Sequence, residues 1–262
     1  MLEIYQIDAF ASKLFTGNPA AVCPLDVWLD EKYMQCIAAE NNVSETAFFV
    51  QNKDGYDIRW FTPTVEVDLC GHATLAAAYV LFEELGFVGD TIVFQSQSGE
   101  LKVSKDGDKF VLDFPSQRAV ACETPKVIEQ AFDAYVIQSC LKAEDYVVVL
   151  EGEADVLAAS PDLTLLKQLD LRGVVITAKS QQYDFVSRFF APNCGIDEDP
   201  VTGSSFTQLA PYWAEVLGKP KLAAKQLSKR GGDVWCELAG DRVYIAGQAV
   251  KYSQGFIASS LL

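Results

Sequence analysis

The sequence predicts an α+β fold that contains one domain twice. Residues 59–74 and 188–204 resemble one another, and each stretch carries a glycine-led turn into a helix. The glycines that follow are spaced alike in both copies: Gly86 and Gly99 after Gly71, and Gly218 and Gly231 after Gly203. Two copies are too few for a solenoid, so they indicate a duplicated domain. A cleft between two such halves is a natural place for a small-molecule site.

The first copy combines strands with two helices. Residues 2–10 alternate in polarity as a strand does, and Gly17-Asn18-Pro19 marks a turn. Helical spacing of apolar residues predicts a helix over 30–41, and a nearly all-apolar stretch predicts a buried helix over 73–85. Strands are expected over residues 20–22, 46–50, 56–61, 91–96, 100–104 and 109–114.

The second copy follows a polar link over residues 115–126. Its expected strands cover residues 133–137, 146–150, 173–178, 183–190, 234–238 and 242–246, and its expected helices cover residues 162–169 and 204–217. Pro211 lies within the last helix and removes a backbone donor, so a kink or a late start is expected there. The domains are expected over residues 1–117 and 118–247, with residues 248–262 free to pack back on the first.

Composition narrows the functional classes. The 262 residues carry a formal net charge of −15, which repels nucleic acid and anionic membrane surfaces. No apolar stretch is long enough for a membrane helix. Seven scattered cysteines and one histidine, His72, predict reduced thiols and no metal site. The start lacks the features of a signal peptide, so the cytoplasm is the expected location.

Gly71 and Gly203 each introduce a helix. The unpaired N–H groups at a helix N-terminus can hold a carboxylate or an enolate. A simpler interpretation is that the glycines only permit turns, and that Ser204 or Ser205 caps its helix. Because the motif occurs at matching positions in both copies, we expect the two helix starts to face one cleft.

Three ionisable residues are candidates for acid–base chemistry. Glu45 stands at the mouth of an apolar strand, where desolvation raises the proton affinity of a carboxylate, but it could also be a solvated loop residue. His72 is either an acid–base group or a hydrogen-bonded core histidine. Asp199 could orient a substrate amine or the histidine, or belong to a plain loop. Cys70 leaves a thiol hydrolase as a further alternative.

Together these motifs resemble the PhzF family of phenazine-biosynthesis-like isomerases. The matching segments run nearly end to end, at residues 8–10, 15–22, 44–48, 59–63, 66–75 and 198–204. The resemblance implies the diaminopimelate-epimerase-like fold, in which two pseudo-symmetric domains each curl a β-sheet around a central helix and the active site lies between them.

The resemblance also implies a biosynthetic, cofactor-independent isomerase or epimerase that moves a proton on a small amino- or hydroxy-carboxylic acid, expected as a homodimer. Glu45 corresponds to the family's proton-transfer residue, and His72 and Asp199 assist it. The corresponding substrate-binding positions are Asn18, Gly71, Gly203 and Ser204. The alternative function on the same fold is a non-catalytic protein that binds a metabolite or a partner.

One position departs from the family pattern. The second motif commonly continues Gly-Ser-Ala-His, whereas Phe206 stands in place of that histidine here. This replacement leaves His72 as the only imidazole and leaves the identity of the substrate open.

Overall fold

The computed structural model describes residues 1–258, which divide into two compact units. The first comprises Met1–Asp113 and the chain from Ala246 onward, and the second comprises Phe114–Ile245. The first contains β1 (Leu2–Ala9), β2 (Asn18–Leu25), α1 (Glu31–Asn41), β3 (Glu45–Gln51), β4 (Tyr56–Phe61), β5 (Glu66–Val67), α2 (Gly71–Tyr79), the π-helix η1 (Val80–Glu84), β6 (Thr91–Ser96), β7 (Gly99–Asp106), β8 (Lys109–Pro115) and β18 (Ala249–Ile257).

The second unit has more elements, several of them short. It contains β9 (Val120–Cys122), α3 (Lys126–Ala131), β10 (Ile137–Lys142), β11 (Tyr146–Leu150), α4 (Glu153–Ala158), α5 (Leu163–Leu166), β12 (Val174–Lys179), β13 (Phe185–Ala191), η2 (Pro192–Cys194), β14 (Ile196–Asp199), η3 (Gly203–Ser205), α6 (Phe206–Leu217), β15 (Lys221–Gln226), β16 (Gly232–Ala239) and β17 (Arg242–Gly247).

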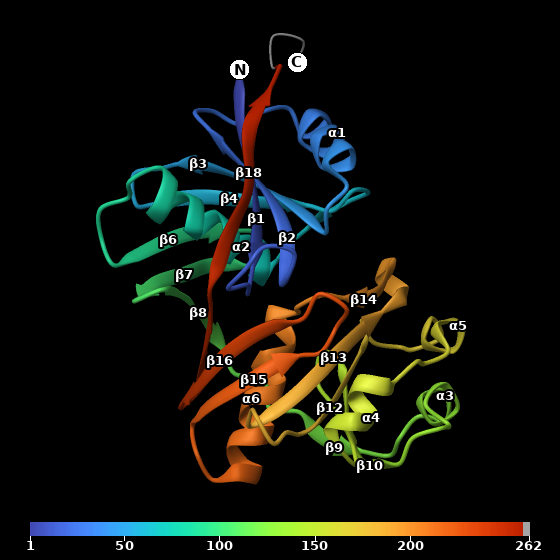
Figure 1. The fold of residues 1–262 in the computed structure, drawn as a ribbon. Coiled ribbons are helices and arrows are strands. Elements are labelled where there is room, and N and C mark those ends of the chain that lie inside the picture. Colours follow the sequence, from blue (N-terminus) through green and yellow to red (C-terminus); the bar gives the residue numbers. More distant parts are fainter. Residues whose placement is uncertain (259–262) are drawn as a thin grey trace. The chain divides into compact units, whose positions relative to one another are not determined.

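The strands of the first unit surround α2. They pair in the order β18–β1–β2–β3–β4–β6–β7–β8, parallel at β2/β3 and β4/β6 and antiparallel elsewhere. The first strand, β1, and the last, β18, run side by side (Figure 1). Helix α2 contacts β1, β2, β3, β7 and β18, and all of residues 72–78 are buried. A helix that is apolar nearly all round is stable only when it is covered in this way.

The second unit repeats the pairing scheme of the first. Strands β11 and β12 are parallel, β12 and β13 antiparallel, β13 and β15 parallel, and β15 and β16 antiparallel. The succession β2, β3, β4, β6 and β7 shows the same alternation. Helix α6 contacts β15 and β16 and buries Trp213, whose ring stacks on Phe185 at 5.6 Å. The duplication predicted from the glycine spacing is thus visible in the sheet order.

A repeated ion pair marks the same relationship at the level of side chains. Arg59 donates Nε and Nη2 to the carboxylate of Glu66, at 2.7 and 2.6 Å. Arg188 donates the same two atoms to Glu198, at 2.6 and 3.0 Å. Each guanidinium also lies over the phenylalanine ring two residues further along its strand, 5.2 Å from it in the first unit and 5.0 Å in the second. Bidentate pairs of this kind hold a strand to the segment that leads to the helix.

Several expected elements differ from those observed. The helix expected over residues 73–85 begins at Gly71 and continues from Val80 as a π-helix. The helix expected over 162–169 is a single turn, Leu163–Leu166. The strand expected over 133–137 is wrong, because those residues turn after α3 and β10 begins only at Ile137. Strands β15 and β18, and helices α3 and α4, have no counterpart among the expectations.

Helix α6 runs through Pro211 without ending. A proline at this position cannot donate to the carbonyl four residues earlier, which belongs to Thr207. The backbone N–H of Gln117 donates to that carbonyl instead, at 3.0 Å. Gln117 lies in the link expected over residues 115–126, so the link supplies the donor that the helix lacks. The α-helix begins at Phe206, two residues after the expected start and upstream of Pro211, because residues 203–205 form a 3-10 turn.

Candidate functional site

The first unit contains a buried pair of ionisable residues. Glu45 is the first residue of β3, and His72 is the second residue of α2. His72 Nε2 lies 3.1 Å from Glu45 Oε2, and the two residues are only 5% and 8% exposed. Neither atom reaches hydrogen-bond geometry with any residue in the described part of the chain. Both therefore keep capacity to bind a ligand, and a buried polar group without a partner calls for a functional explanation.

The other nitrogen of His72 faces Asn18. Asn18 Nδ2 lies 3.3 Å from His72 Nδ1, and Ser44 Oγ donates to Asn18 Oδ1 at 3.0 Å. Since the amide oxygen is occupied, the amide nitrogen points at His72, and Nδ1 of a neutral ring acts as the acceptor. The proton of the neutral ring is then on Nε2, facing Glu45. Sequence reasoning missed Ser44. Its hydroxyl orients the side-chain amide of Asn18, and that amide orients the imidazole ring of His72.

Cys70 completes the surroundings of His72. Its Sγ lies 3.5 Å from His72 Nδ1, and its backbone C=O accepts from Thr74 Oγ1 at 2.6 Å. Burial, followed by the negative charge of Glu45, raises the pKa of Cys70 to about 11. Cys70 is therefore a neutral thiol near pH 7, which is the unreactive form.

The protonation of His72 follows from these neighbours. Burial acts to lower the pKa of His72, but the negative charges available on Cys70 and Glu45 outweigh it, and the pKa lies well above its ordinary value. Because Cys70 is a neutral thiol near pH 7, the Glu45 carboxylate is the charge that favours the imidazolium there. Nε2 carries a proton in the imidazolium and also in the neutral ring described above. Glu45 thus faces an N–H group in either state.

Glu45, Cys70 and His72 also form a potential metal-binding group, since each offers one ligand atom within 4.8 Å of the others. Their arrangement around the ring does not suit one ion. Cys70 Sγ lies at Nδ1, whereas Glu45 Oε2 lies at Nε2, on the opposite edge of the imidazole. A zinc ion needs its ligands to converge from a tetrahedron, with one nitrogen of the ring.

The start of α2 supplies backbone N–H groups beside Glu45 and His72. Gly71 is its first residue, and the preceding Cys70 makes no side-chain capping hydrogen bond. The first N–H groups of an α-helix lack intrahelical partners and carry partial positive charge. An uncapped helix start next to Glu45 and His72 can therefore hold a carboxylate or a developing enolate.

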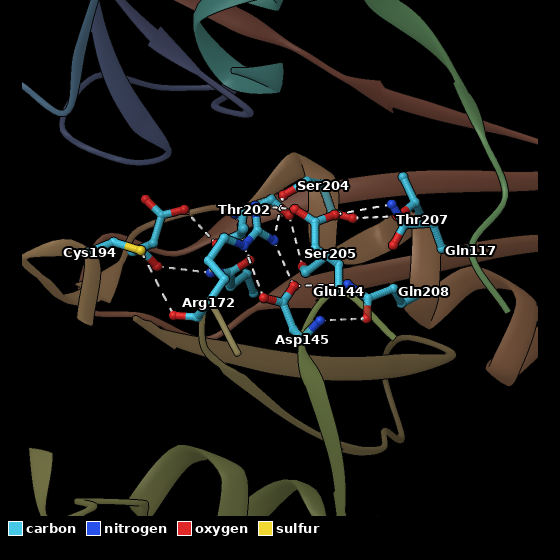
Figure 2. A network of polar contacts seen from close by, with 12 residues as sticks. Gln117, Glu144, Asp145, Arg172, Cys194, Thr202, Ser204, Ser205, Thr207 and Gln208 are labelled. Carbon is cyan, nitrogen blue, oxygen red and sulfur yellow. Dashed lines mark hydrogen bonds and ion pairs between the residues drawn. The ribbon is translucent and has the colours of Figure 1, made fainter. Parts of the chain in front are cut away.

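The second unit holds Ser204 in a network of charged groups, shown in Figure 2. Ser204 lies in η3, which leads into α6, and its Oγ accepts from Arg172 Nη2 at 3.0 Å. Arg172 also donates Nε and Nη2 to the fully buried carboxylate of Asp145, at 2.9 and 2.6 Å. Since the lone pair of Ser204 Oγ is engaged by Arg172, the hydroxyl proton is directed elsewhere and can be donated to a ligand.

Asp145 is fixed from both sides. Gln208 Nε2 donates to Asp145 Oδ2 at 2.8 Å, and Gln208 Oε1 accepts from the Asp145 backbone N–H at 3.2 Å. Glu144 adds a second carboxylate 3.1 Å from Arg172 Nη1. Burial lowers the pKa of Arg172, but Asp145 and Glu144 more than offset this and raise it. With two carboxylates on it, Arg172 serves to position Ser204 rather than to bind an anion itself.

Asp199 closes the turn that precedes η3. It ends β14, is 8% exposed, and its Oδ2 accepts from Thr202 Oγ1. The amide of the fully buried Gln226 braces the turn, donating to the Asp199 carbonyl at 2.8 Å and accepting from the Thr202 backbone N–H at 2.9 Å. Thr202 precedes Gly203 as Cys70 precedes Gly71, so the second copy carries a hydroxyl where the first carries a thiol.

The structure groups the sequence-predicted residues by unit. Asn18, Glu45, Gly71 and His72 come together in the first, and Asp199, Gly203 and Ser204 lie along one turn of the second. The expectation that Ser205 caps its helix is wrong, because Ser205 Oγ donates to the Thr202 carbonyl instead.

Sequence reasoning missed Arg172, Asp145 and Gln226. For Asp145 a signal existed, since it precedes the apolar strand β11 as Glu45 precedes the apolar part of β3. Arg172 lies in the segment before β12, and nothing in its local pattern points to Ser204.

Known proteins resemble this chain over its whole length. An uncharacterized isomerase of Pseudomonas aeruginosa is 52% identical over 254 residues, which cover 97% of this chain and 98% of that protein. The crystal structure of a PhzF-family phenazine biosynthesis protein of Enterococcus faecalis matches with a TM-score of 0.95 at 45% identity, covering 97% of this chain and 98% of that one. A hydroxyproline epimerase of Agrobacterium vitis shares the fold, with a TM-score of 0.64 at 11% identity over 97% of this chain and 91% of that one.

The expected fold class is confirmed: both units are mixed α/β, and the fold is the PhzF and diaminopimelate-epimerase-like one. The Pseudomonas aeruginosa relative is named an isomerase, and a predicted epimerase of the same organism, at 21% identity, shares the fold. In the described residues no helix has the length and apolar character needed to span a membrane. The profile of the phenazine biosynthesis-like protein family matches residues 7–255, and the chain belongs to that family.

Proposed function

We propose that the protein is a cofactor-independent isomerase or epimerase that moves a proton on a small amino- or hydroxy-carboxylic acid, with Glu45 as the general acid and base. The observation that carries the proposal is the pair formed by Glu45 and His72. Glu45 Oε2 is buried, lies 3.1 Å from His72 Nε2, and makes no hydrogen bond with the described residues. A carboxylate held in this way is ready to accept a proton from carbon.

In this mechanism Glu45 removes a proton from the carbon next to the substrate carboxyl group and returns it to another carbon. Inversion at the same carbon would need a second proton donor on the opposite face. The N–H groups at the start of α2 stabilise the negative charge that develops as the proton leaves. His72 Nε2 lies 3.1 Å from Glu45 Oε2, so the protonated ring attracts the carboxylate through its charge. Each step moves only protons, so no redox group is needed.

The second unit would bind the rest of the substrate. Ser204, positioned by Arg172, donates its hydroxyl proton to a substrate oxygen, and the backbone N–H groups at Gly203 contribute as those at Gly71 do. Asp199 would bind a substrate amine, with its carboxylate set by Thr202. The expectation that both helix starts face one substrate stays a prediction.

The state of Cys70 argues against the thiol alternative. Its pKa is raised to about 11 by burial and by Glu45, so little thiolate exists near pH 7. A nucleophilic cysteine has the opposite shift. Cys70 Sγ lies 3.5 Å from His72 Nδ1, the nitrogen that also faces Asn18.

Proton exchange with solvent tests the proposal directly. The protein is incubated in D₂O with a panel of amino acids and cyclic amino- and hydroxy-acids, and deuterium incorporation is followed by NMR. We expect one class of acid to exchange at the carbon next to its carboxyl group. Tight binding of an acid without any exchange would instead support a non-catalytic binding protein.

Cellular and assembly properties belong to the same proposal. We expect a homodimer in the cytoplasm that takes part in a biosynthetic process, without a metal or organic cofactor. Dialysis against a chelator should leave exchange unchanged, and sedimentation should give twice the mass of 28.7 kDa. Loss of exchange on chelation, with recovery on adding one metal, would show that the cofactor-independent mechanism is wrong.

A further inference from the structure

Two cysteines lie opposite one another in the second unit, on strands that carry none of the candidate site residues. Strand β9 pairs antiparallel with β10, and Cys122 is the direct partner of Cys140 in their register. Their sulfur atoms are 3.7 Å apart. Cys122 is partly exposed, whereas Cys140 is 3% exposed. Neither thiol has a part in the proposed proton transfer.

The backbone already satisfies the requirements of a disulfide. Directly opposite residues of an antiparallel pair have Cα atoms about 4.5 or 5.5 Å apart, depending on the type of pair. Both values fall in the range of about 4.4–6.8 Å seen in disulfides. A sulfur–sulfur bond is about 2.05 Å long, so the two sulfur atoms must approach by less than about 2 Å, which side-chain rotation provides.

We propose that Cys122 and Cys140 form a reversible oxidation site that is converted to a disulfide by a low-molecular-weight disulfide such as oxidised glutathione. The Cys122 thiolate attacks one sulfur of oxidised glutathione, forming a mixed disulfide and releasing one reduced glutathione. The Cys140 thiol then loses its proton and attacks the Cys122 sulfur, releasing the second glutathione. Two protein thiols are oxidised, and one glutathione disulfide is reduced to two thiols.

The surroundings set the order of these two attacks. Cys122 is the more accessible sulfur, so it meets the oxidant first. Burial, and then the neighbouring Cys122, raise the pKa of Cys140 to about 12, which makes Cys140 a poor first nucleophile. Once Cys122 carries glutathione it no longer has a negative charge, and one cause of that raised pKa is gone. Cys140 then acts as the resolving thiol.

The disulfide would tie the segment that follows the link between the halves to the sheet of the second unit. It closes a loop that contains α3 (Lys126–Ala131). Closing a loop restricts the unfolded chain, so the oxidised protein is expected to be the more stable form. Oxidising conditions would then raise the free energy of unfolding of the second unit through the Cys122–Cys140 disulfide.

The other thiols offer contrasts within the same chain. Cys36 and Cys194 are exposed, so they can accept glutathione from the oxidant. Cys23 and Cys236 are buried, and burial raises the pKa of both. The double variant Cys36→Ser, Cys194→Ser therefore removes the two exposed thiols and leaves Cys122 and Cys140 as the main site of reaction.

The test uses the full chain of that double variant, incubated at about pH 8 with oxidised glutathione. Free thiols are then alkylated in denaturant, and intact mass and peptide mapping follow. We expect a loss of two hydrogen atoms and one linked peptide pair, Cys122 with Cys140, reversed by dithiothreitol. The midpoint of thermal unfolding should rise by several degrees on oxidation.

Two single variants separate the attack of Cys122 on oxidised glutathione from the attack of Cys140 on the mixed disulfide. Cys140→Ser should accumulate a stable glutathione adduct at Cys122, and Cys122→Ser should give neither an adduct nor a link at Cys140. The proposal is overturned if both thiols remain free to alkylation after oxidation. It is also overturned if the parent keeps glutathione on Cys122 as Cys140→Ser does, because the second attack then does not occur.

Discussion

His72 directs its Nε2 atom at Glu45, 3.1 Å from Oε2, while Asn18 occupies the side of Nδ1. Three segments meet in this contact: the start of β2, the start of β3 and the start of α2. The parallel pairing of β2 and β3 sets Ala20 opposite Glu45, which fixes the height of the carboxylate along the sheet. The contact between Glu45 and His72 is therefore a consequence of strand register and helix start together.

Replacing Glu45 by glutamine should remove the proton acceptor while keeping the shape of the side chain. We expect kcat for proton exchange to fall by about 10²–10⁴-fold, with little change in the affinity for the substrate acid. NMR exchange rates and ligand titration measure the two quantities. Glu40→Gln is the matched control, because Glu40 is exposed at the end of α1. A Glu45→Gln protein that exchanges at the parent's rate would refute the assignment.

Stability should fall as pH rises through the titration of His72. The pKa of His72 in the folded protein lies well above its ordinary value, so the folded state binds the proton more tightly than the unfolded state. The resulting stabilisation is fully present below about pH 6.5 and is lost as pH rises through the raised pKa. Unfolding midpoints between about pH 6 and 8 measure it, below the range in which unfolded thiols ionise.

The variant Glu45→Gln identifies the cause of this dependence. Without the carboxylate, His72 loses its main negative neighbour near pH 7, and the decline between about pH 6 and 8 should become shallower. His72→Asn should flatten it further, since the chain has no other histidine. An unchanged slope in both variants would mean that another group carries the dependence.

Much of this site could be predicted from the sequence because its signals are local. Glu45 is the first residue of an apolar strand, and Gly71 and His72 are the first residues of an apolar helix. Each candidate could therefore be recognised from the residues that follow it. Arg172 gave no such signal. It reaches Ser204 and Asp145 across segments far apart in the chain, and only the folded sheet brings them together.

The errors in the fold have the same origin. Strand β15 has only one large apolar residue, Leu222, and β18 shows no regular alternation in burial. Pairing with β16 and with β1 stabilises these two strands. Local propensity cannot report a partner strand that lies far away in the sequence. Pro211 shows the converse, since the local rule predicted a kink or a late start but could not report that the distant N–H of Gln117 replaces the donor that the proline lacks.

Gly17 should be irreplaceable for a steric reason. It adopts φ +68°, and a Cβ there would lie 2.1 Å from the backbone oxygen of Ala9. Gly17→Ala is therefore expected to destabilise the protein by more than about 2 kcal/mol. Gly218 has a similar φ of +65° with nothing within 4 Å, so Gly218→Ala should cost only about 1 kcal/mol. Denaturant unfolding compares the two, and equal losses would show that the clash relaxes at no cost.

Ser204 and Arg172 should act as one unit in binding the substrate. Ser204→Ala removes the hydroxyl, and Arg172→Lys removes the fork that holds the hydroxyl while keeping the positive charge. We expect each change to raise KM for the exchanging acid by about 10-fold with a smaller effect on kcat. The double variant should be no worse than Ser204→Ala, because coupled residues are not additive.

Arg188→Lys is the control that separates the positioning of Ser204 by Arg172 from a general loss of protein stability. Arg188 is a largely buried arginine of the same unit, and two of its nitrogens donate to Glu198 as two nitrogens of Arg172 donate to Asp145. Its other hydrogen bonds go to the backbone carbonyls of Val156, Leu157 and Ala159 and not to Ser204. Both lysine variants should lower the unfolding midpoint, but only Arg172→Lys should raise KM. If the two raise KM equally, the effect of Arg172 is structural. If Arg172→Lys and Ser204→Ala multiply in the double variant, Arg172 acts on the substrate independently of the hydroxyl.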